Sequence, residues 1–315
     1  MSDARYIVGI DGGGSKTAVA VADRAGRILG RGAGGASNYQ AVGLEAATHA
    51  LNTAVTAALD AAGIAVADVV AVCLGQAGVD RPEDHAVFNA WLAAAFPGVR
   101  SRISNDGYLV LAAGTPAEVG IALISGTGVV CIARNGAGKT ARFDGWGHVM
   151  GDLGSGYYIG RRALQASMCA YDGRGPQTSL LPTILAHWGL ARPEQLIARV
   201  YQAPATTTDI AALAPFVDAA AGEGDEAARG IVQDAGAELA RTVATAARVL
   251  EFDGEIACAL AGGTITKGLQ VQAAFFEGVA HAGVCLHPVE VVTDPVLGAI
   301  RMARRLLPDE LVGTA

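Results

Sequence analysis

Residues 9–23, GIDGGGSKTAVAVAD, place a carboxylate directly before three consecutive glycines and several side chains that can donate to an anion. Because glycine lacks a Cβ atom, the backbone N–H groups of such a hairpin can close on a phosphate, and hydroxyl side chains add donors. Asp11 ends the preceding strand, where its carboxylate could hold a hydrated Mg²⁺ against that phosphate. A glycine-rich hairpin that binds no ligand is the alternative. The predicted phosphate contacts are Gly12, Gly13, Gly14, Ser15, Lys16 and Thr17.

The spacing of these residues excludes two familiar phosphate loops. A Walker loop needs G-x-x-x-x-G-K-[ST] before a helix, whereas Ser15 separates Gly14 from Lys16 and a strand-like run follows. The dinucleotide fingerprint G-x-G-x-x-G fails because Thr17 stands where the third glycine should be. The pattern therefore predicts a phosphate-binding β-hairpin of another kind.

The elements that must position these residues alternate between strands and helices, which is typical of an α/β sheet. The same hairpin pattern recurs at residues 119–138, where Thr127 and Gly128 lie in a second glycine turn. After a glycine-rich connection at 143–160, the chain is predicted to be mostly helical to about residue 250. Besides the two strands of this second hairpin, the predicted strands are 6–11, 17–23, 27–31, 69–75, a run ending at 103–107, 256–263 and 283–292. The other predicted helices are 44–62, 83–95, one between the last two strands and one from about 295.

Length and charge narrow the class of protein. A chain of 315 residues is long enough for two domains, and two similar hairpins suggest two similar lobes. A formal net charge of −7 without Lys or Arg clusters argues against nucleic acid as a partner. No signal peptide or membrane-spanning stretch is recognisable, so we expect a cytoplasmic protein that does not bind a membrane. The five cysteines are scattered without metal-ligand or redox spacing.

Three glycine motifs together resemble those of a known superfamily. IDGGGSKT, ISGTGVV and LAGGTITKG resemble the phosphate 1, phosphate 2 and adenosine motifs of the actin, Hsp70 and sugar-kinase superfamily. More narrowly, GASNYQ, SNDG, SGTG and GWGHVMGDLGSGYYIG look like the BadF/BadG/BcrA/BcrD ATPase family and, within it, the N-acetylglucosamine kinases. The long glycine-rich segment at 145–160 is the most specific of these motifs.

The resemblance implies an α/β fold of two ribonuclease-H-like lobes with a nucleotide cleft between them. We expect the first lobe at 1–118, completed by a C-terminal helix at 296–315, and the second lobe at 119–295 with a helical insertion. ATP and Mg²⁺ are the implied cofactors. By the resemblance, Thr127 and Gly128 contact phosphate, whereas Gly262 and Gly263 leave room for the adenosine and Thr264 is a weaker candidate.

The residues predicted to bind the sugar, which accepts the phosphate, are polar residues that lie beside apolar ones in the sequence. Asp106 ends an apolar run, and in the resembling kinases this aspartate is the catalytic base that takes the proton of the sugar C6 hydroxyl. One oriented carboxylate with Mg²⁺ can suffice, because phosphoryl transfer is mainly positioning and charge stabilisation. The alternatives are that Asp106 and Asn38 only form turns, that Trp146 packs in the core, and that His148 has a structural role. The other predicted sugar contacts are Asn38, Gly145, Trp146 and Asp152, with Asp106 itself also touching the sugar.

These observations favour an ATP-dependent amino-sugar kinase, acting as a homodimer on N-acetylglucosamine, glucosamine or N-acetylmuramic acid. Many relatives have a Glu where this chain has Leu153, so any sugar contact of that Glu is in doubt. An activator ATPase of 2-hydroxyacyl-CoA dehydratases is an alternative, but it needs paired cysteines, and only Cys131 lies near the second hairpin. A sugar-sensing regulator without catalysis, and a kinase of the ROK family with its zinc-binding cluster, are further alternatives with less support.

Overall fold

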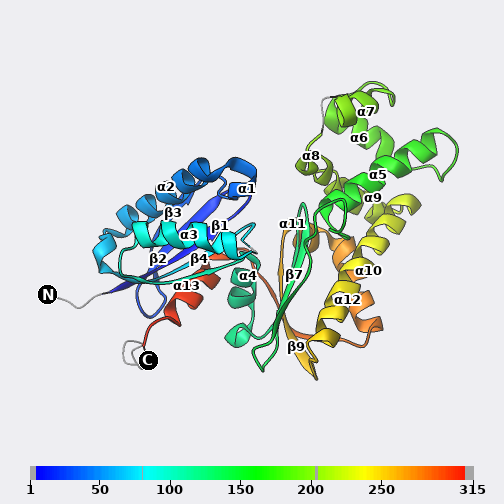
Figure 1. The fold of residues 1–315 in the computed structure, drawn as a ribbon. Coiled ribbons are helices and arrows are strands. Elements are labelled where there is room, and N and C mark those ends of the chain that lie inside the picture. The colour runs from blue at the N-terminus through cyan, green and yellow to red at the C-terminus, as the bar shows by residue number, and fades with distance from the viewer. Residues whose placement is uncertain (1–4, 80, 203–204, 309–315) are drawn as a thin grey trace. The chain divides into compact units, whose positions relative to one another are not determined.

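Two five-stranded sheets with the same strand order organise the chain (Figure 1). The structure is a computed structural model, and it describes residues 5–79, 81–202 and 205–308. The chain up to Glu118 and the segment from Val292 onward form one unit, and Val119–Val291 form a second unit. The second unit thus ends four residues earlier than the expected boundary at 295.

The first sheet has the order β3-β2-β1-β4-β5. Its strands are β1 (Tyr6–Gly12), β2 (Thr17–Ala22), β3 (Ile28–Gly34), β4 (Val69–Gln76) and β5 (Arg100–Ser104). β1 pairs antiparallel with β2 and parallel with β4, and β5 continues the parallel part. The carboxyl ends of β1, β4 and β5 therefore meet at one edge of the sheet, which is where ligands usually bind in open α/β sheets.

Helices cover both faces of this sheet. Apolar side chains of α2 (Leu44–Ala62) and α3 (Pro82–Ala95) share a core with one face, and those of α4 (Gly107–Gly114) and α13 (Val296–Arg304) share a core with the other. The short helix α1 (Tyr39–Val42) precedes α2, and 3₁₀ turns lie at Val66–Asp68 and Pro116–Glu118. Because α13 comes from the end of the chain, the first unit is built from two separate segments of sequence.

Helix α2 lies unusually close to β3 because glycines alternate along that strand. A Cβ atom on Gly32 would lie 2.0 Å from the carbonyl oxygen of Ala54 and 2.6 Å from the nitrogen of Ala58, both in the backbone of α2. Gly30 and Gly34, on the same face of β3, have similar close approaches to α2. The helix therefore rests on the strand backbone itself.

The second sheet has the order β10-β9-β6-β7-β8. Its strands are β6 (Gly120–Ser125), β7 (Val129–Arg134), β8 (Thr140–Asp144), β9 (Glu255–Ala261) and β10 (Cys285–Val291). β6 pairs antiparallel with β7 and parallel with β9, as β1 does with β2 and β4. The second hairpin therefore occupies in its own sheet the position that the first hairpin occupies in the other.

A helical region between β8 and β9 packs on the second sheet through a single apolar core. Asp225 begins its longest helix, α10, by accepting from the Ala228 backbone N–H at 3.0 Å, and it also accepts from Ser179 and Thr178. The helices of this unit are α5 (Gly156–Tyr171), α6 (Leu180–Trp188), α7 (Gln195–Ile197), α8 (Thr207–Ala211), α9 (Ala214–Glu223), α10 (Glu226–Val249), α11 (Gly263–Lys267) and α12 (Leu269–His281), with a π-helical turn at Ala198–Gln202.

Most of the expected elements are confirmed, and the differences are local. The helix at 44–62 has the expected bounds, and Gly63 ends it in the left-handed conformation. Sequence reasoning missed β8, and the connection expected to reach residue 160 ends where α5 begins at Gly156. The helix expected at 296–315 stops at Arg304, and its last part, residues 309–315, lies outside the described residues.

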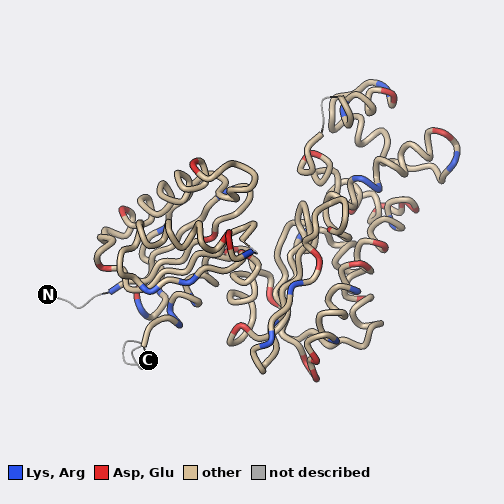
Figure 2. Tube along the Cα trace, in the orientation of Figure 1, with Lys and Arg blue, Asp and Glu red and all other residues tan. Residues whose placement is uncertain are grey.

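Acidic and basic positions are interspersed along both units (Figure 2). Across residues 5–79, 81–202 and 205–308, none of the helices is both long enough and apolar enough to cross a membrane.

Candidate functional site

The first glycine hairpin is closed by its own backbone. The Gly13 N–H donates to the Lys16 carbonyl at 3.0 Å, and the Gly13 carbonyl accepts from the Ser37 N–H at 3.1 Å. Gly14, Ser15 and Lys16 at the tip are exposed. The tip of the loop is therefore open to a phosphate, and phosphate contacts by Gly12 and Gly13 stay predictions.

Thr17 lies below this tip and is fully buried. Its hydroxyl is 2.8 Å from the Gly35 carbonyl and 2.9 Å from Ser37 Oγ, so it ties the hairpin to the loop after β3. The buried Gln76 joins the same loop by donating from Nε2 to the Ser37 carbonyl at 2.6 Å. A Cβ atom on Gly12 would lie 2.2 Å from Gln76 Oε1, so this glycine makes room for Gln76. A phosphate contact by Thr17 stays a prediction.

Asp11 and Asp106 lie at the same edge of the first sheet. Asp11, Gly75 and Ser104 are level with one another across β1, β4 and β5, and Asp106 follows two residues after Ser104. Burial and then the negative charge of Asp106 raise the pKa of Asp11 to about 7. The two carboxylates therefore interact electrostatically, and a cation between or beside them would lower their mutual repulsion.

This pair fits the expected Mg²⁺, which takes oxygen ligands and keeps several waters. No group of three or more His, Cys, Asp or Glu side chains in the described part of the chain could hold a metal by itself. Asp11 would therefore hold Mg²⁺ together with water and phosphate oxygens. Asn105 fixes the neighbouring turn, because its Oδ1 accepts from the Gly107 N–H at 2.9 Å at the start of α4.

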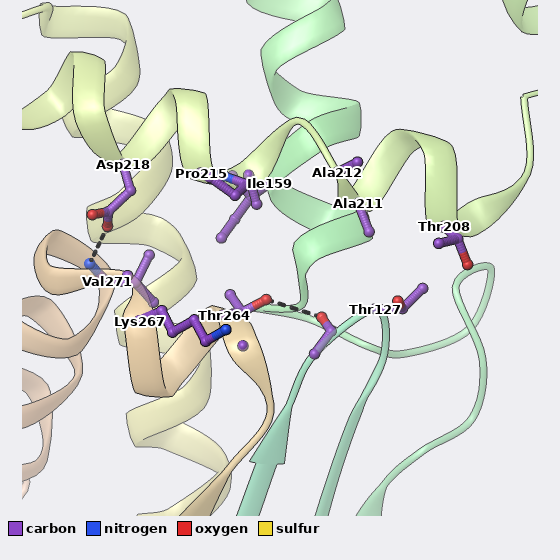
Figure 3. Close-up of a pocket in the computed structure, with 14 residues that line it drawn as sticks. Thr127, Ile159, Thr208, Ala211, Ala212, Pro215, Asp218, Thr264, Lys267 and Val271 are labelled. Atoms are coloured by element: carbon purple, nitrogen blue, oxygen red, sulfur yellow. Dashed lines mark hydrogen bonds between the residues drawn. The ribbon is translucent and has the colours of Figure 1, made fainter. Parts of the chain in front are cut away.

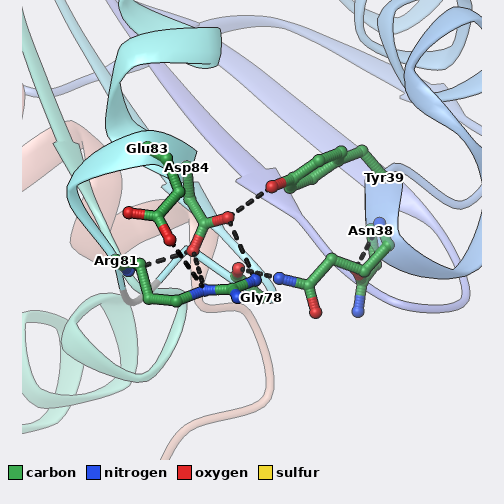
Figure 4. Close-up of polar contacts among 7 residues, drawn as sticks. Asn38, Tyr39, Gly78, Arg81, Glu83 and Asp84 are labelled. Atoms are coloured by element: carbon green, nitrogen blue, oxygen red, sulfur yellow. Dashed lines mark hydrogen bonds and ion pairs between the residues drawn. The ribbon is translucent and has the colours of Figure 1, made fainter.

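Asn38 lies in the loop between β3 and α1, and a network of polar residues holds that loop (Figure 4). Its Oδ1 accepts from the Gln40 N–H at 3.2 Å and caps α1, and the Gln40 side chain donates to the Gly78 carbonyl at 3.0 Å. Tyr39 OH donates to the buried Asp84, which also accepts from Arg81 at the start of α3. Asn38 therefore does stabilise the turn before α1, and it uses the oxygen of its side-chain amide to do so.

In the second unit, Asp152 packs against the second glycine hairpin. Its Oδ1 accepts from the Val129 N–H at 3.2 Å, and a Cβ atom on Gly128 would lie 2.9 Å from its Oδ2. Burial raises the pKa of Asp152. The carboxylate predicted to contact the sugar therefore also supports the turn that carries Thr127, whose side chain is exposed.

The loop after β8 presents Trp146 to solvent. Asp144 Oδ1 accepts from the N–H groups of Gly145 and Asp152, each at 2.8 Å, and so joins the two ends of this loop. The Trp146 side chain is 62% exposed, with the Arg142 guanidinium 5.1 Å from the ring centroid. A purely core role for Trp146 is therefore wrong. Sequence reasoning missed Asp144, although the Asp-Gly pair before Trp146 is a turn signal.

A pocket of about 570 Å³ lies between the second hairpin and the helices of the same unit (Figure 3). Gly126, Thr127 and Gly263 line it together, which joins the phosphate 2 and adenosine motifs in one cavity. Thr264 Oγ1 donates to the Gly126 carbonyl at 3.0 Å, so Thr264 also fastens the two motifs to each other. Gly262 is required at this junction, because its φ is 88° and a Cβ atom would lie 2.4 Å from the Ser125 carbonyl.

The predicted residues thus form two groups, one on each unit. Asp11, the first hairpin, Asn38 and Asp106 gather at the edge of the first sheet, whereas the second hairpin, Asp152, Gly145, Trp146, Gly262 and Gly263 belong to the second unit. Lys267 and Asp218 also line the pocket, and sequence reasoning did not single them out. The KG pair that ends the adenosine motif was the available signal for Lys267.

Two sheets of like order, each with a glycine hairpin at its first strand, define the class of actin-like ATPases and sugar kinases. A crystal structure of a candidate N-acetylglucosamine kinase from Chromobacterium violaceum superposes with a TM-score of 0.75 at 27% identity, covering 95% of this chain and 99% of that one. A ROK family glucokinase from Streptomyces griseus, solved with glucose and AMPPNP, has the same fold, with a TM-score of 0.59 at 19% identity over 95% of this chain and 98% of that one.

Residues 8–303 match the BadF/BadG/BcrA/BcrD ATPase family, and the chain belongs to that family. It is 34% identical over 264 residues to the N-acetylmuramic acid/N-acetylglucosamine kinase of Clostridium acetobutylicum, covering 84% of this chain and 86% of the relative. It is 33% identical over 259 residues to the N-acetyl-D-glucosamine kinase of Dictyostelium discoideum, covering 79% of this chain and 81% of the relative. The expected family and fold class are confirmed.

Proposed function

We propose that this protein is an ATP-dependent kinase that phosphorylates the C6 hydroxyl of N-acetylglucosamine or a close relative of that sugar. The observation that carries the proposal is the pair of carboxylates at the edge of the first sheet, in a chain whose curated relatives are amino-sugar kinases. Asp106 would accept the hydroxyl proton while the sugar oxygen forms its bond to the γ-phosphorus and ADP leaves. Mg²⁺, held by Asp11 through water, would neutralise charge on the phosphates.

The nucleotide would lie in the pocket of the second unit, with its phosphates toward Thr127. The acceptor would contact Asn38 and Asp106 in the first unit. A sugar contact by the exposed ring of Trp146, in the second unit, stays a prediction. The alternative of an activator ATPase has less support, because Cys131, the cysteine near the second hairpin, is fully buried in an apolar core and is not available as a ligand of a shared iron–sulfur cluster. A homodimer and a cytoplasmic location stay predictions.

A panel of sugars tests this function. In a coupled assay of ADP release, we expect N-acetylglucosamine, glucosamine or N-acetylmuramic acid to raise the rate at least about tenfold over glucose, because a site that bonds a substrate group rejects the analogue lacking it. ADP release that does not depend on any of the three sugars would contradict the kinase assignment. Mass spectrometry of the product would show whether a phosphate has been added to the sugar.

Asn38→Asp should separate the turn role of this residue from its sugar contact. The aspartate oxygen can still accept from the Gln40 N–H, so α1 keeps its cap, but the amide donor is lost. We expect the KM for the sugar to rise about tenfold, as for a lost hydrogen bond of roughly 1.4 kcal/mol, with an unchanged melting temperature. Asn89→Asp on α3 is the matched control. A variant with the KM of the unaltered protein would exclude the contact.

A further inference from the structure

Lys267 is an isolated cation on the wall of the pocket in the second unit. It is one of only three lysines in the chain, beside Lys16 in the first hairpin and Lys139 in the turn between β7 and β8. Its side chain is exposed, and it makes no hydrogen bond or ion pair with any residue that the structure describes. An ammonium group that lines a cavity without a protein partner is available for an anionic ligand.

The chemistry of the pocket differs from one end to the other (Figure 3). Asp218 and Val271 lie at one end, and there Asp218 Oδ1 accepts from the N–H groups of Gln270 and Val271 at 3.0 and 3.1 Å. Thr127 lies toward the other end, and the side chain of Lys267, which also lines the pocket, appears between the two ends in this view. The Asp218 carboxylate thus accepts hydrogen bonds from the first turn of α12, and it forms no ion pair with Lys267.

The wall between these ends is made of small and apolar side chains, among them Ala211, Ala212 and Pro215. Such a surface suits the faces of a nucleobase, whereas a hydroxyl and an ammonium suit phosphate. If a nucleotide lies along the pocket with its phosphates toward Thr127, its inner phosphates come nearest to Lys267.

We propose that Lys267 binds the inner phosphates of the nucleotide and thereby makes the pocket prefer a nucleotide over a nucleoside. This inference rests on the proposed function, because it takes the pocket to be the nucleotide site. A structural role for Lys267 would be limited to a weak interaction with the carbonyl end of α11, a helix of five residues. Such a role would change stability slightly and would treat ADP and adenosine alike.

Calorimetry with ADP and with adenosine tests the proposal, using Lys267→Met and, as a matched control, Lys139→Met. Lys139 is exposed outside the pocket, and its Nζ donates to the Val249 carbonyl at 3.2 Å. We expect Lys267→Met to weaken ADP binding by about 10- to 100-fold, as for a lost charge-assisted contact, and to leave adenosine binding unchanged. The control should bind both ligands like the unaltered protein. Equal affinities for ADP in the two variants, or an equal loss for both ligands, would overturn the proposal.

Failure of the proposed function would look different. If the unaltered protein binds no ADP, the proposed function and the role of Lys267 both fall. If Ala211→Phe in the pocket wall leaves ADP binding intact, the nucleotide does not use this pocket, and the role of Lys267 falls while the kinase function still depends on the sugar-dependent release of ADP. If Ala211→Phe abolishes ADP binding while Lys267→Met does not weaken it, only the role of Lys267 is wrong.

Covalent labelling gives a second, independent measurement. In an ADP derivative acylated on its terminal phosphate, a nearby lysine amine attacks the acyl carbonyl, an amide forms, and ADP leaves while the amine loses a proton to water. With three lysines in the chain, peptide mass spectrometry can assign the product directly. We expect acylation of Lys267 that excess ADP prevents, and none at Lys139. An unmodified Lys267 beside a modified Lys139 would contradict the proposal.

Discussion

Asp106→Asn should lower kcat by about 10² to 10⁴, the usual loss when a positioned proton acceptor is removed. Asparagine keeps the size of the side chain but cannot accept the hydroxyl proton, so the sugar oxygen would have to attack while still protonated. Asp106 sits at the carboxyl edge of the first sheet, close enough to Asp11 for its charge to raise the pKa of that residue. Steady-state kinetics with saturating ATP and sugar measures the loss.

The affinity of the variant for ADP should stay within a few-fold of that of the unaltered protein, which separates a chemical defect from a folding defect. Asp60→Asn, an exposed substitution on α2 in the same unit, is the matched control and should turn over normally. Turnover of Asp106→Asn at the rate of this control would show that another group accepts the proton, and the kinase mechanism would need a different base.

Gly32→Ala should strongly destabilise the first unit. The added methyl group would lie 2.0 Å from the Ala54 carbonyl oxygen, and two further backbone atoms of α2 are within 3.1 Å. Since the neighbouring atoms belong to a helix backbone and not to a flexible side chain, α2 must move away from β3. Overpacking of this kind costs about 3 kcal/mol or more, which corresponds to a fall of roughly 10 °C in the unfolding temperature.

Gly35→Ala is the matched control, because a Cβ atom on Gly35 would meet no other atom within 4 Å. Thermal unfolding followed by circular dichroism compares the two variants. Equal unfolding temperatures would mean that the close packing of α2 on β3 does not limit the stability of this unit.

Local patterns predicted those elements whose apolar residues have a clear period. The helix Leu44–Ala62 has apolar residues on one face and Gly63 at its end, and both signals lie within the segment itself. β8 was missed because its sequence, TARFD, has no continuous apolar run, and its pairing with β7 decides its structure. The close approach of α2 to β3 could not be inferred either, because it depends on glycines and helix atoms that lie far apart in sequence.

Candidate site residues could be predicted where they belong to a sequence motif, and less well where tertiary packing determines their contacts. Asp106, Thr127 and Gly263 were found from their motifs, and the structure places the last two on one pocket. The motif predicts a phosphate contact for Thr17 but not the contacts of its buried hydroxyl with Gly35 and Ser37, which depend on tertiary packing. The role of Gln76 arises only when the loops after β1, β3 and β4 meet, so no local sequence pattern could show it.

The division of the first unit into two segments has a consequence for synthesis of the chain. Helix α13 supplies buried residues such as Ile300 and Met302 to the core on one face of the first sheet, although it leaves the ribosome only after the whole of the second unit. The second unit is continuous and can complete its core earlier. One face of the N-terminal sheet therefore lacks the apolar cover of α13 until the whole intervening unit has been synthesised. A premature stop before Val296 would damage the beginning of the protein more than its middle.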